Sequence, residues 1–345
     1  MTVSTDILNQ QSDSDILISI IMPVYNCEKF IRQALDSLIN QDCPEKNYEI
    51  VITDDGSTDS TGKICDDYAA KYSFIHVTHT MNMGVSHARN TAMFQCKGEY
   101  ITFCDGDDEV SPQLISVLTR AVDIYGKPDI IAYSHFKIMP SEGWPVYDIK
   151  NMKSSEAELI DSETLIIRTA CSWGGYSWNK IFRSELAKSL RFDETLKVGM
   201  DHYWLMSLLT LHRDIKICCI NYYLYHYIDH PNIGQTRQLD RVYDQNGMKR
   251  SIIYYEKTLA LENFPERAAE KEHGRIYEQS VFVLYENQVD FSQDTYRRLR
   301  SYMRRYALEY YRSYETSMFL KAATFIKHIL IIFHIHKRRK KNPRH

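Results

Sequence analysis

The chain has 345 residues, of which 44% are hydrophobic and 25% are charged. These proportions are ordinary for a folded globular protein and exclude a collagen-like or low-complexity chain. The length is sufficient for one large domain or two smaller ones. The eight cysteines lack Cys-x-x-Cys spacing and a matching histidine set, so the pattern favours reduced, buried thiols over a zinc site.

The net charge of −3 is divided unevenly along the chain. Residues 297–345 contain fourteen Lys or Arg and two Glu, a balance of +12, so the remaining residues carry −15. An acidic body with a basic tail indicates two surfaces with different partners. An anionic membrane and nucleic acid are the candidate partners of the tail, and the acidic body argues against nucleic acid.

Short apolar runs alternate with helical patterns between residues 16 and 134. Residues 1–15 are polar and acidic, so we expect a disordered leader, no signal peptide and a cytoplasmic location. Strands are predicted, in chain order, at residues 18–22, 48–53, 74–78, 100–104 and 129–134. Helices are predicted at residues 30–39, from 57–59 to 72, at 86–95 and from 112 onward. This alternation predicts an α/β fold with a mainly parallel sheet covered by helices on both faces.

The alternation of strand and helix patterns becomes irregular after residue 140. It recovers at residues 177–190 and at a helix that begins near Asp201, and residues 240–315 are helical in pattern throughout. A break at residues 229–234 predicts a boundary near residue 235. The predicted parts are a leader, an α/β domain, a helical C-terminal region and a basic amphipathic tail, at residues 1–15, 16–235, 236–315 and 316–345.

Three carboxylates, those of Asp105, Asp107 and Asp108, directly follow the fourth predicted strand. Carboxylates so close together repel one another unless a cation lies among them. Gly106 lies between two of them, where glycine permits a sharp turn and a close approach to a ligand. A second polar cluster, residues 54–59, follows the second strand, and the carboxyl ends of parallel strands share one edge of a sheet. The sequence therefore predicts a site where a hard divalent cation bridges carboxylates and a phosphate-bearing substrate.

Four ordered motifs carry a resemblance to a known family. They are SIIMPVYN at residues 19–26, DDGSTD at 54–59, NMGVSHARN at 82–90 and GEYITFCDGDD at 98–108. With these motifs, residues 17–130 resemble the inverting glycosyltransferases of family 2, of the bacterial surface-polysaccharide type. The resemblance is weaker at residues 178–180 and 199–201 and fades after residue 230. It implies the nucleotide-binding GT-A fold and the transfer of a sugar from a nucleotide donor to an acceptor hydroxyl.

The resemblance also implies which residues bind the nucleotide sugar. They are Pro23, Tyr25, Asp55, Arg89, Asp105 and Gly106. Tyr25 would offer its ring to the base, and Asp55 would accept the N3–H of uracil, a donor that cytosine lacks, so UDP is favoured. Asp105 would bind the ribose hydroxyls, and Asp107 would hold Mn²⁺ or Mg²⁺ against the two phosphates of the donor.

Several residues of these motifs also have a purely structural interpretation. Tyr25 could serve as ordinary packing, and Asp54 could hold the turn that follows the second strand. Asp59 suits a helix cap better than a ligand. Arg89 could be a surface arginine on a solvated helix face.

Transfer to a hydroxyl requires a general base, and a carboxylate suits that role. The resemblance assigns it to Asp201, although the family usually shows Glu-Asp where this chain has Met200 and Asp201. The alternative for Asp201 is a helix N-cap. The resemblance also places Trp178, Asn179 and Lys180 near the sugar or the acceptor.

The basic tail begins with an apolar helical pattern at residues 319–336, which Lys321, Lys327 and His328 interrupt. This segment is too short and too charged to span a bilayer. Residues 337–341 are all basic, and an apolar helix with a polybasic end is typical of an interfacial anchor. We therefore expect a peripheral protein at the inner face of the cell membrane, with a saccharide or lipid-linked saccharide as acceptor. The alternative is a docking helix with a solvated tail.

Two other functions are compatible with parts of the sequence. A nucleotidyltransferase of similar fold would need a glycine-rich, lysine-bearing phosphate loop near the first strand, and residues 23–27 offer none. A protein that binds a nucleotide sugar without transferring it would show the same motifs and no turnover.

Overall fold

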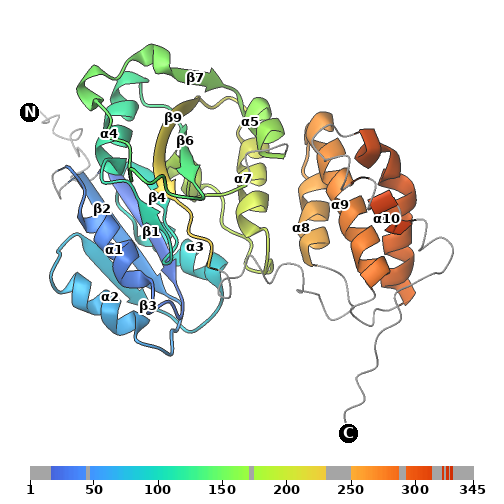
Figure 1. Ribbon diagram of the computed structural model, residues 1–345, viewed down its shortest axis with the longest axis horizontal. Helices are drawn as coiled ribbons and strands as arrows, with labels where there is room; N and C mark the ends of the chain where they lie inside the picture. Colours follow the sequence, from blue (N-terminus) through green and yellow to red (C-terminus); the bar gives the residue numbers. More distant parts are fainter. Residues whose placement is uncertain are drawn as a thin grey trace, which may run out of the picture. The chain divides into compact units, whose positions relative to one another are not determined.

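The computed structural model describes five main stretches of the chain and five single residues near its C-terminal end. They are residues 17–43, 47–170, 175–230, 250–286 and 293–312, with Lys321, Thr324, Phe325, Lys327 and His328. The chain divides into two compact units that interleave along the sequence (Figure 1). The first unit comprises residues 1–157, Trp178–Ser189 and Cys219–Ile228, and the second comprises Glu158–Ser177, Leu190–Cys218 and residues 229–345.

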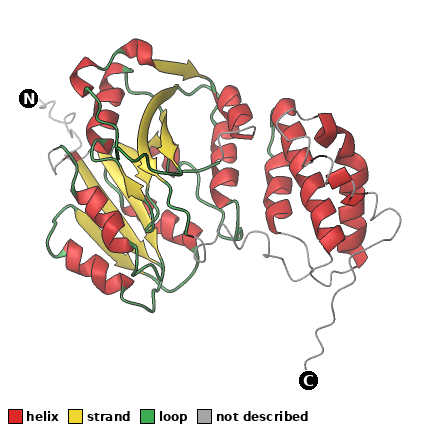
Figure 2. Cartoon of the chain, in the orientation of Figure 1, coloured by secondary structure: helices red, strands yellow, loops and turns green. Residues whose placement is uncertain are grey.

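The secondary structure alternates strands and helices in the first half of the chain and is helical toward the C-terminal end (Figure 2). The strands are β1 (Ile18–Val24), β2 (Tyr48–Asp54), β3 (Ile75–His79), β4 (Tyr100–Phe103), β5 (Glu109–Val110), β6 (Ile130–Phe136), β7 (Ala157–Ile160), β8 (Lys180–Arg183) and β9 (Ile217–His226). The α-helices are α1 (Ile31–Ile39), α2 (Thr61–Ala69), α3 (Val85–Gln95), α4 (Leu114–Ile124), α5 (Ser162–Arg168), α6 (Ser184–Lys188), α7 (Met200–Leu211), α8 (Arg250–Leu259), α9 (Glu266–Glu286) and α10 (Gln293–Arg312). Two short 3₁₀ turns lie at Ile149–Asn151 and Ser154–Glu156.

The sheet has the strand order β3-β2-β1-β4-β8-β6-β9-β5. Strands β3, β2, β1 and β4 are parallel neighbours, as the alternating pattern predicts. Strand β8 is antiparallel to both β4 and β6, and β5 is antiparallel to β9. The α/β class with a parallel nucleus and a helical C-terminal region is thus confirmed, and antiparallel pairing extends the sheet beyond β4.

Burial explains why the first strands form where they do. Every residue of β1, β2 and β4 is buried, which is typical of parallel strands covered on both faces. Helix α1 buries its apolar positions and lies beside α2, and α3 packs against β1 and β2 (Figure 1). The register aligns the strand ends, because Val24 lies opposite Asp54 and Ile21 lies opposite Phe103. The loops that follow β1, β2 and β4 therefore start at one edge of the sheet.

Strand β1 continues through Pro23, although the sequence predicts that the proline ends it. Along a strand, the backbone N–H and C=O groups of successive residues point alternately to the two neighbouring strands. The carbonyl of Ile21 points to the β4 side, because it accepts a hydrogen bond from the Cys104 N–H. Pro23 therefore also faces the β4 side, and the pairing of β4 with β1 ends at Phe103. The missing N–H of Pro23 removes no bond from the ladder, which is why a proline is tolerated there.

The second unit contains α5, α7, α8, α9 and α10. Helix α7 packs with α5 and α8, and α9 packs with α8 and α10. Helices α8, α9 and α10 confirm a helical C-terminal region, although residues 260–265, between α8 and α9, are not helical. The predicted boundary near residue 235 and the leader at residues 1–15 lie outside the described residues, as does the tail at 316–345 apart from five residues. No helix of the described chain is long and apolar enough to cross a bilayer.

Candidate active site

Asp55 fastens the loop before α3 to the end of β2. It is buried, and its two carboxylate oxygens accept hydrogen bonds from the backbone N–H groups of Met83 and Gly84, each at 2.8 Å. Gly84 has a φ of 99°, a conformation that favours glycine. A carboxylate has about four acceptor positions, so these two bonds leave capacity for a further donor. Binding of a uracil N3–H by Asp55 stays a prediction.

The two other aspartates of the motif after β2 have structural roles. Asp54 Oδ1 accepts from the Ser57 N–H at 3.0 Å, and its Oδ2 lies 2.9 Å from Nδ1 of His79. This hydrogen bond raises the pKa of His79 above its ordinary value. Asp59 accepts from the N–H of Thr61, the first residue of α2, at 2.9 Å. The N-cap position of α2 is Ser60, so Asp59 lies just before the cap and its side chain bonds the first helical N–H, whereas Asp54 holds the turn.

The loop after β1 leaves the Tyr25 side chain 47% exposed. Asn26 follows it with a φ of 47°, a left-handed conformation that asparagine tolerates. The Asn26 side-chain oxygen accepts from the Thr58 N–H at 2.8 Å, and the Asn26 N–H donates to Ser57 at 2.9 Å. These bonds tie the loop after β1 to the loop after β2, and they leave the Tyr25 ring accessible to a ligand.

Arg89 and Asp105 form an ion pair at this edge of the sheet. Arg89 comes from α3, is only 4% exposed, and places Nη2 3.1 Å from Oδ1 of Asp105. It is therefore not a surface arginine on a solvated face. Gly106 follows Asp105 and packs so closely that a Cβ there would lie 2.9 Å from Cγ1 of Val24. Glycine at this position lets the acidic turn lie against the end of β1.

Asp108 is the most buried of the three clustered carboxylates, with 1% exposure. Its Oδ2 accepts from the Tyr225 hydroxyl at 2.7 Å, and its Oδ1 accepts from the Ile228 N–H at 2.8 Å. Burial, with the nearby charges of Asp105 and Asp107, raises the pKa of Asp108 to about 8. The carboxylates of the acidic turn therefore repel one another, and a divalent cation bound there would reduce this repulsion.

The acidic turn supplies carboxylate oxygens, the ligand type that Mg²⁺ prefers, and the assignment of a cation to Asp107 stays a prediction. Asp105 pairs with Arg89, Asp108 accepts from Tyr225, and the Asp107 side chain is half-buried. Within the described ranges, no group of three or more His, Cys, Asp or Glu side chains is arranged to hold a metal. An ion here would need further oxygen ligands from a phosphate-bearing substrate and water, as is usual for Mg²⁺.

Trp178, Asn179 and Lys180 are all buried. The Trp178 ring, 3% exposed, stacks on Tyr225 with 4.5 Å between ring centroids, and Lys180 Nζ donates to the Asn179 side-chain oxygen at 2.7 Å. These contacts give the three residues a place in the core below the acidic turn. Contact of any of them with a sugar or an acceptor stays a prediction.

Asp201 lies in the first turn of α7, in the second unit. Its Oδ2 accepts from the Ser177 hydroxyl at 3.0 Å. The N-cap position of α7 is Gly199, with a φ of 69°, and a Cβ there would lie 2.2 Å from the Tyr254 ring. Asp201 is thus not the cap of its helix. Its role as general base stays a prediction.

Tyr225 is a site residue that the sequence analysis does not identify. Its hydroxyl donates to Asp108 and accepts from the Asp105 N–H at 3.1 Å, while its ring supports Trp178. It lies on β9, more than a hundred residues after the acidic turn, and belongs to none of the four motifs.

The fold and this edge define a class of protein: a transferase domain of GT-A type. Residues 19–187 match the family model described as Glycosyl transferase family 2. This part of the chain is a family 2 glycosyltransferase domain.

Two curated proteins are similar in sequence. Glycosyltransferase GlyA from Streptococcus pneumoniae is 32% identical over 225 residues, which are 62% of this chain and 30% of GlyA. TarS from Staphylococcus aureus, a poly(ribitol-phosphate) beta-N-acetylglucosaminyltransferase, is 32% identical over 192 residues, which are 55% of this chain and 32% of TarS. The chain spans less than two thirds of the length of either relative.

Two solved structures are similar in fold. Residues 1–349 of Staphylococcus aureus TarS, in complex with UDP-GlcNAc, align with a TM-score of 0.62 and 20% identity over 93% of this chain and 89% of that one. The mannosyltransferase PcManGT from Pyrobaculum calidifontis, in complex with GDP-Man and Mn²⁺, aligns with a TM-score of 0.51 and 19% identity over 92% and 87%.

Proposed function

We propose that the chain is a metal-dependent, inverting glycosyltransferase that transfers a sugar from a UDP-sugar to an acceptor hydroxyl. We further propose that it acts in the synthesis of a bacterial surface polysaccharide. The observation that carries the proposal is the acidic turn of Asp105, Asp107 and Asp108, which lies with Arg89 at the sheet edge where Asp55 orders the neighbouring loop. This arrangement offers a cation site, a buried guanidinium and an exposed aromatic ring to a nucleotide diphosphate.

The relatives support the donor and the setting. TarS is named for the transfer of N-acetylglucosamine to poly(ribitol-phosphate), and its structure holds UDP-GlcNAc. PcManGT holds Mn²⁺ with its nucleotide sugar. We therefore assign Mn²⁺ or Mg²⁺ to Asp107, and the nucleotide and ribose to the loops that carry Tyr25, Asp55 and Asp105.

In the proposed mechanism, Asp201 removes the proton from the acceptor hydroxyl as that oxygen attacks the anomeric carbon in line. The bond between the anomeric carbon and the diphosphate oxygen breaks in the same step, so the configuration inverts. The cation, when bound, neutralises the charge that develops on the departing UDP. Asp105, held by Arg89, positions the ribose so that the reacting carbon faces the acceptor.

The tail at residues 316–345 supports a peripheral location at the inner face of the membrane, close to a lipid-linked acceptor. Its five consecutive basic residues, 337–341, would each add about 1 kcal/mol of attraction to anionic lipid. A docking helix with a solvated tail is the alternative.

The base assignment is tested with Asp201→Asn. We expect normal UDP-sugar binding and a loss of transfer of about 10²–10⁴-fold, because the amide cannot accept the proton. The measurement is UDP release with acceptor, alongside calorimetric donor binding. Asp214→Asn is the control, since Asp214 lies after α7 in the same unit.

Two results of this experiment would count against the proposal. Near-normal turnover by Asp201→Asn would remove Asp201 as the base. Donor binding by the unaltered protein without UDP release, over a range of acceptors, would favour a nucleotide-sugar-binding protein instead.

A further inference from the structure

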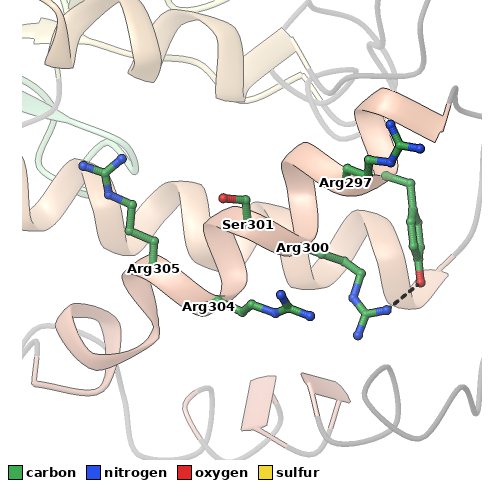
Figure 3. Close-up of a pocket in the computed structure, with 6 residues that line it drawn as sticks. Arg297, Arg300, Ser301, Arg304 and Arg305 are labelled. Atoms are coloured by element: carbon green, nitrogen blue, oxygen red, sulfur yellow. Dashed lines mark hydrogen bonds between the residues drawn. The ribbon is translucent and has the colours of Figure 1, made fainter.

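Helix α10 carries an arginine groove that the proposed reaction does not use. The groove has a volume of about 540 Å³ and is lined by Tyr296, Arg297, Arg300, Ser301, Arg304 and Arg305 (Figure 3). Four of its six lining residues are cationic at every physiological pH. The groove lies within the second unit, on a single helix.

The arginines are poorly neutralised by the protein itself. Arg297 pairs with Asp294 at 3.2 Å, but both side chains are largely exposed. Among the side chains that the structure describes, no carboxylate pairs with Arg300, Arg304 or Arg305. Arg300 and Arg304 are four residues apart, and like charges at that spacing destabilise a helix. The repulsion between these arginines destabilises the helix, and a bound anion would offset that repulsion.

One arginine of the groove is held in place. The Tyr296 hydroxyl accepts from Arg300 Nη1 at 3.3 Å, and the Arg300 guanidinium lies 5.7 Å from the centre of the Tyr296 ring. In Figure 3 the Arg300 and Arg304 side chains extend in the same direction, whereas the Arg305 side chain points away from them. A fixed guanidinium beside a second one suits a phosphate group, which arginine binds through two parallel N–H bonds.

The apolar surface of α10 argues against a membrane as the occupant. The large apolar residues Leu299, Met303 and Tyr306 are buried in a core with α9. None of the exposed large hydrophobic side chains of the described chain lies on α10. An interfacial helix needs exposed large apolar residues to enter the lipid, whereas arginines make up most of the groove lining on this helix.

We propose that the arginine groove binds phosphodiester groups of the acceptor, so that the acceptor is a phosphate-bearing polymer or glycan rather than a neutral one. This inference rests on the proposed function, because it names the acceptor class of the same enzyme. Binding at the groove would retain a long, anionic acceptor on the enzyme.

The test measures binding of a fluorescent oligo(glycerol phosphate) to the full chain by anisotropy. Arg300→Ala/Arg304→Ala should weaken binding by about tenfold per arginine, because each lost hydrogen bond involves a charged group. The matched control is Arg191→Ala/Arg267→Ala, which removes the same charge from exposed positions of the same unit outside the groove. The control should bind as the unaltered protein does, and a neutral dextran oligomer should not bind at all.

Three results would overturn the proposal. The first is no binding of the phosphate oligomer, and the second is an equal loss of oligomer binding in both double variants. The third is a loss of binding by Arg300→Ala/Arg304→Ala to phosphatidylglycerol vesicles, in a separate sedimentation measurement, without a loss of binding to the oligomer. Calorimetry with UDP-GlcNAc on the same samples separates the two hypotheses. Donor binding without oligomer binding contradicts only the groove, whereas an absence of donor binding contradicts the proposed function.

Discussion

At the residue scale, the candidate site depends on a few polar contacts between distant parts of the chain. Tyr225 contributes two of them, because its hydroxyl donates to Asp108 and accepts from the Asp105 N–H. Its ring meanwhile stacks on Trp178. The position of the acidic turn is therefore coupled to the aromatic core beneath it.

Tyr225→Phe separates these two roles. The ring remains, but buried Asp108 loses a hydrogen-bond donor, so we expect the free energy of unfolding to fall by about 1–3 kcal/mol. Metal-dependent donor binding should weaken as well. Urea unfolding and calorimetry measure the two effects. Tyr223→Phe on the same strand is the control, since the Tyr223 ring is partly exposed and stacks on Phe136. Equal stability of the two variants would contradict the role of the Tyr225 hydroxyl.

Sequence reasoning groups the candidate residues that lie in local motifs. It groups Arg89 and Asp105 on the nucleotide side, and the structure pairs them at 3.1 Å. It does not foresee that Asp55 binds two backbone amides, because hydrogen bonds to the backbone depend on loop conformation rather than residue type. Tyr225 is missed for a related reason, since only the folded sheet brings β9 to the acidic turn.

At the element scale, Gly106 determines how the acidic turn packs. A Cβ at this position would approach Val24 Cγ1 to 2.9 Å and Cys27 Sγ to 3.1 Å. We therefore expect Gly106→Ala to destabilise the protein by about 1–3 kcal/mol, because the core around β1 would have to shift.

Gly274→Ala is the matched control and should act in the opposite direction. Gly274 lies within α9, where an added Cβ would be 3.7 Å from Tyr310 Cα, an ordinary contact. Alanine in a helix interior is favoured over glycine by about 0.5–1 kcal/mol, so this variant should be more stable. Thermal and urea unfolding measure the stability of both variants. A Gly106→Ala protein as stable as the unaltered one would show that the turn does not need close packing.

The elements differ in how well the sequence predicts them. Strands β1, β2 and β4 are buried, mostly apolar runs and β3 alternates apolar and polar residues, and the sequence locates each of the four to within a residue or two. Strand β5 has only two residues and thus no periodicity to detect. Strand β6 is predicted at residues 129–134, but its antiparallel pairing is not, because β8 enters the sheet between β4 and β6 from a later part of the chain.

At the scale of the whole molecule, the uneven charge assigns different partners to different parts of the chain. In our proposals, the acidic turn binds a cation and a nucleotide, the arginine groove binds a polyanion, and the tail binds a membrane. Removal of residues 319–345 should abolish sedimentation with phosphatidylglycerol vesicles, because it removes the polybasic segment. Vesicles of phosphatidylcholine are the control for charge. Equal sedimentation with and without the tail would rule out the anchor.

The central claim is that a divalent cation at Asp107 joins a UDP-sugar to the acidic turn. Calorimetric titration of a panel of UDP-sugars, with Mn²⁺ and with a chelator, tests it most directly. We predict that the unaltered protein binds one or two donors only with Mn²⁺ and that Asp107→Asn weakens this binding by about 100-fold. Asp123→Asn, at an exposed position on α4, should bind normally. Donor binding that is unaffected by the chelator, or by Asp107→Asn, would contradict the account.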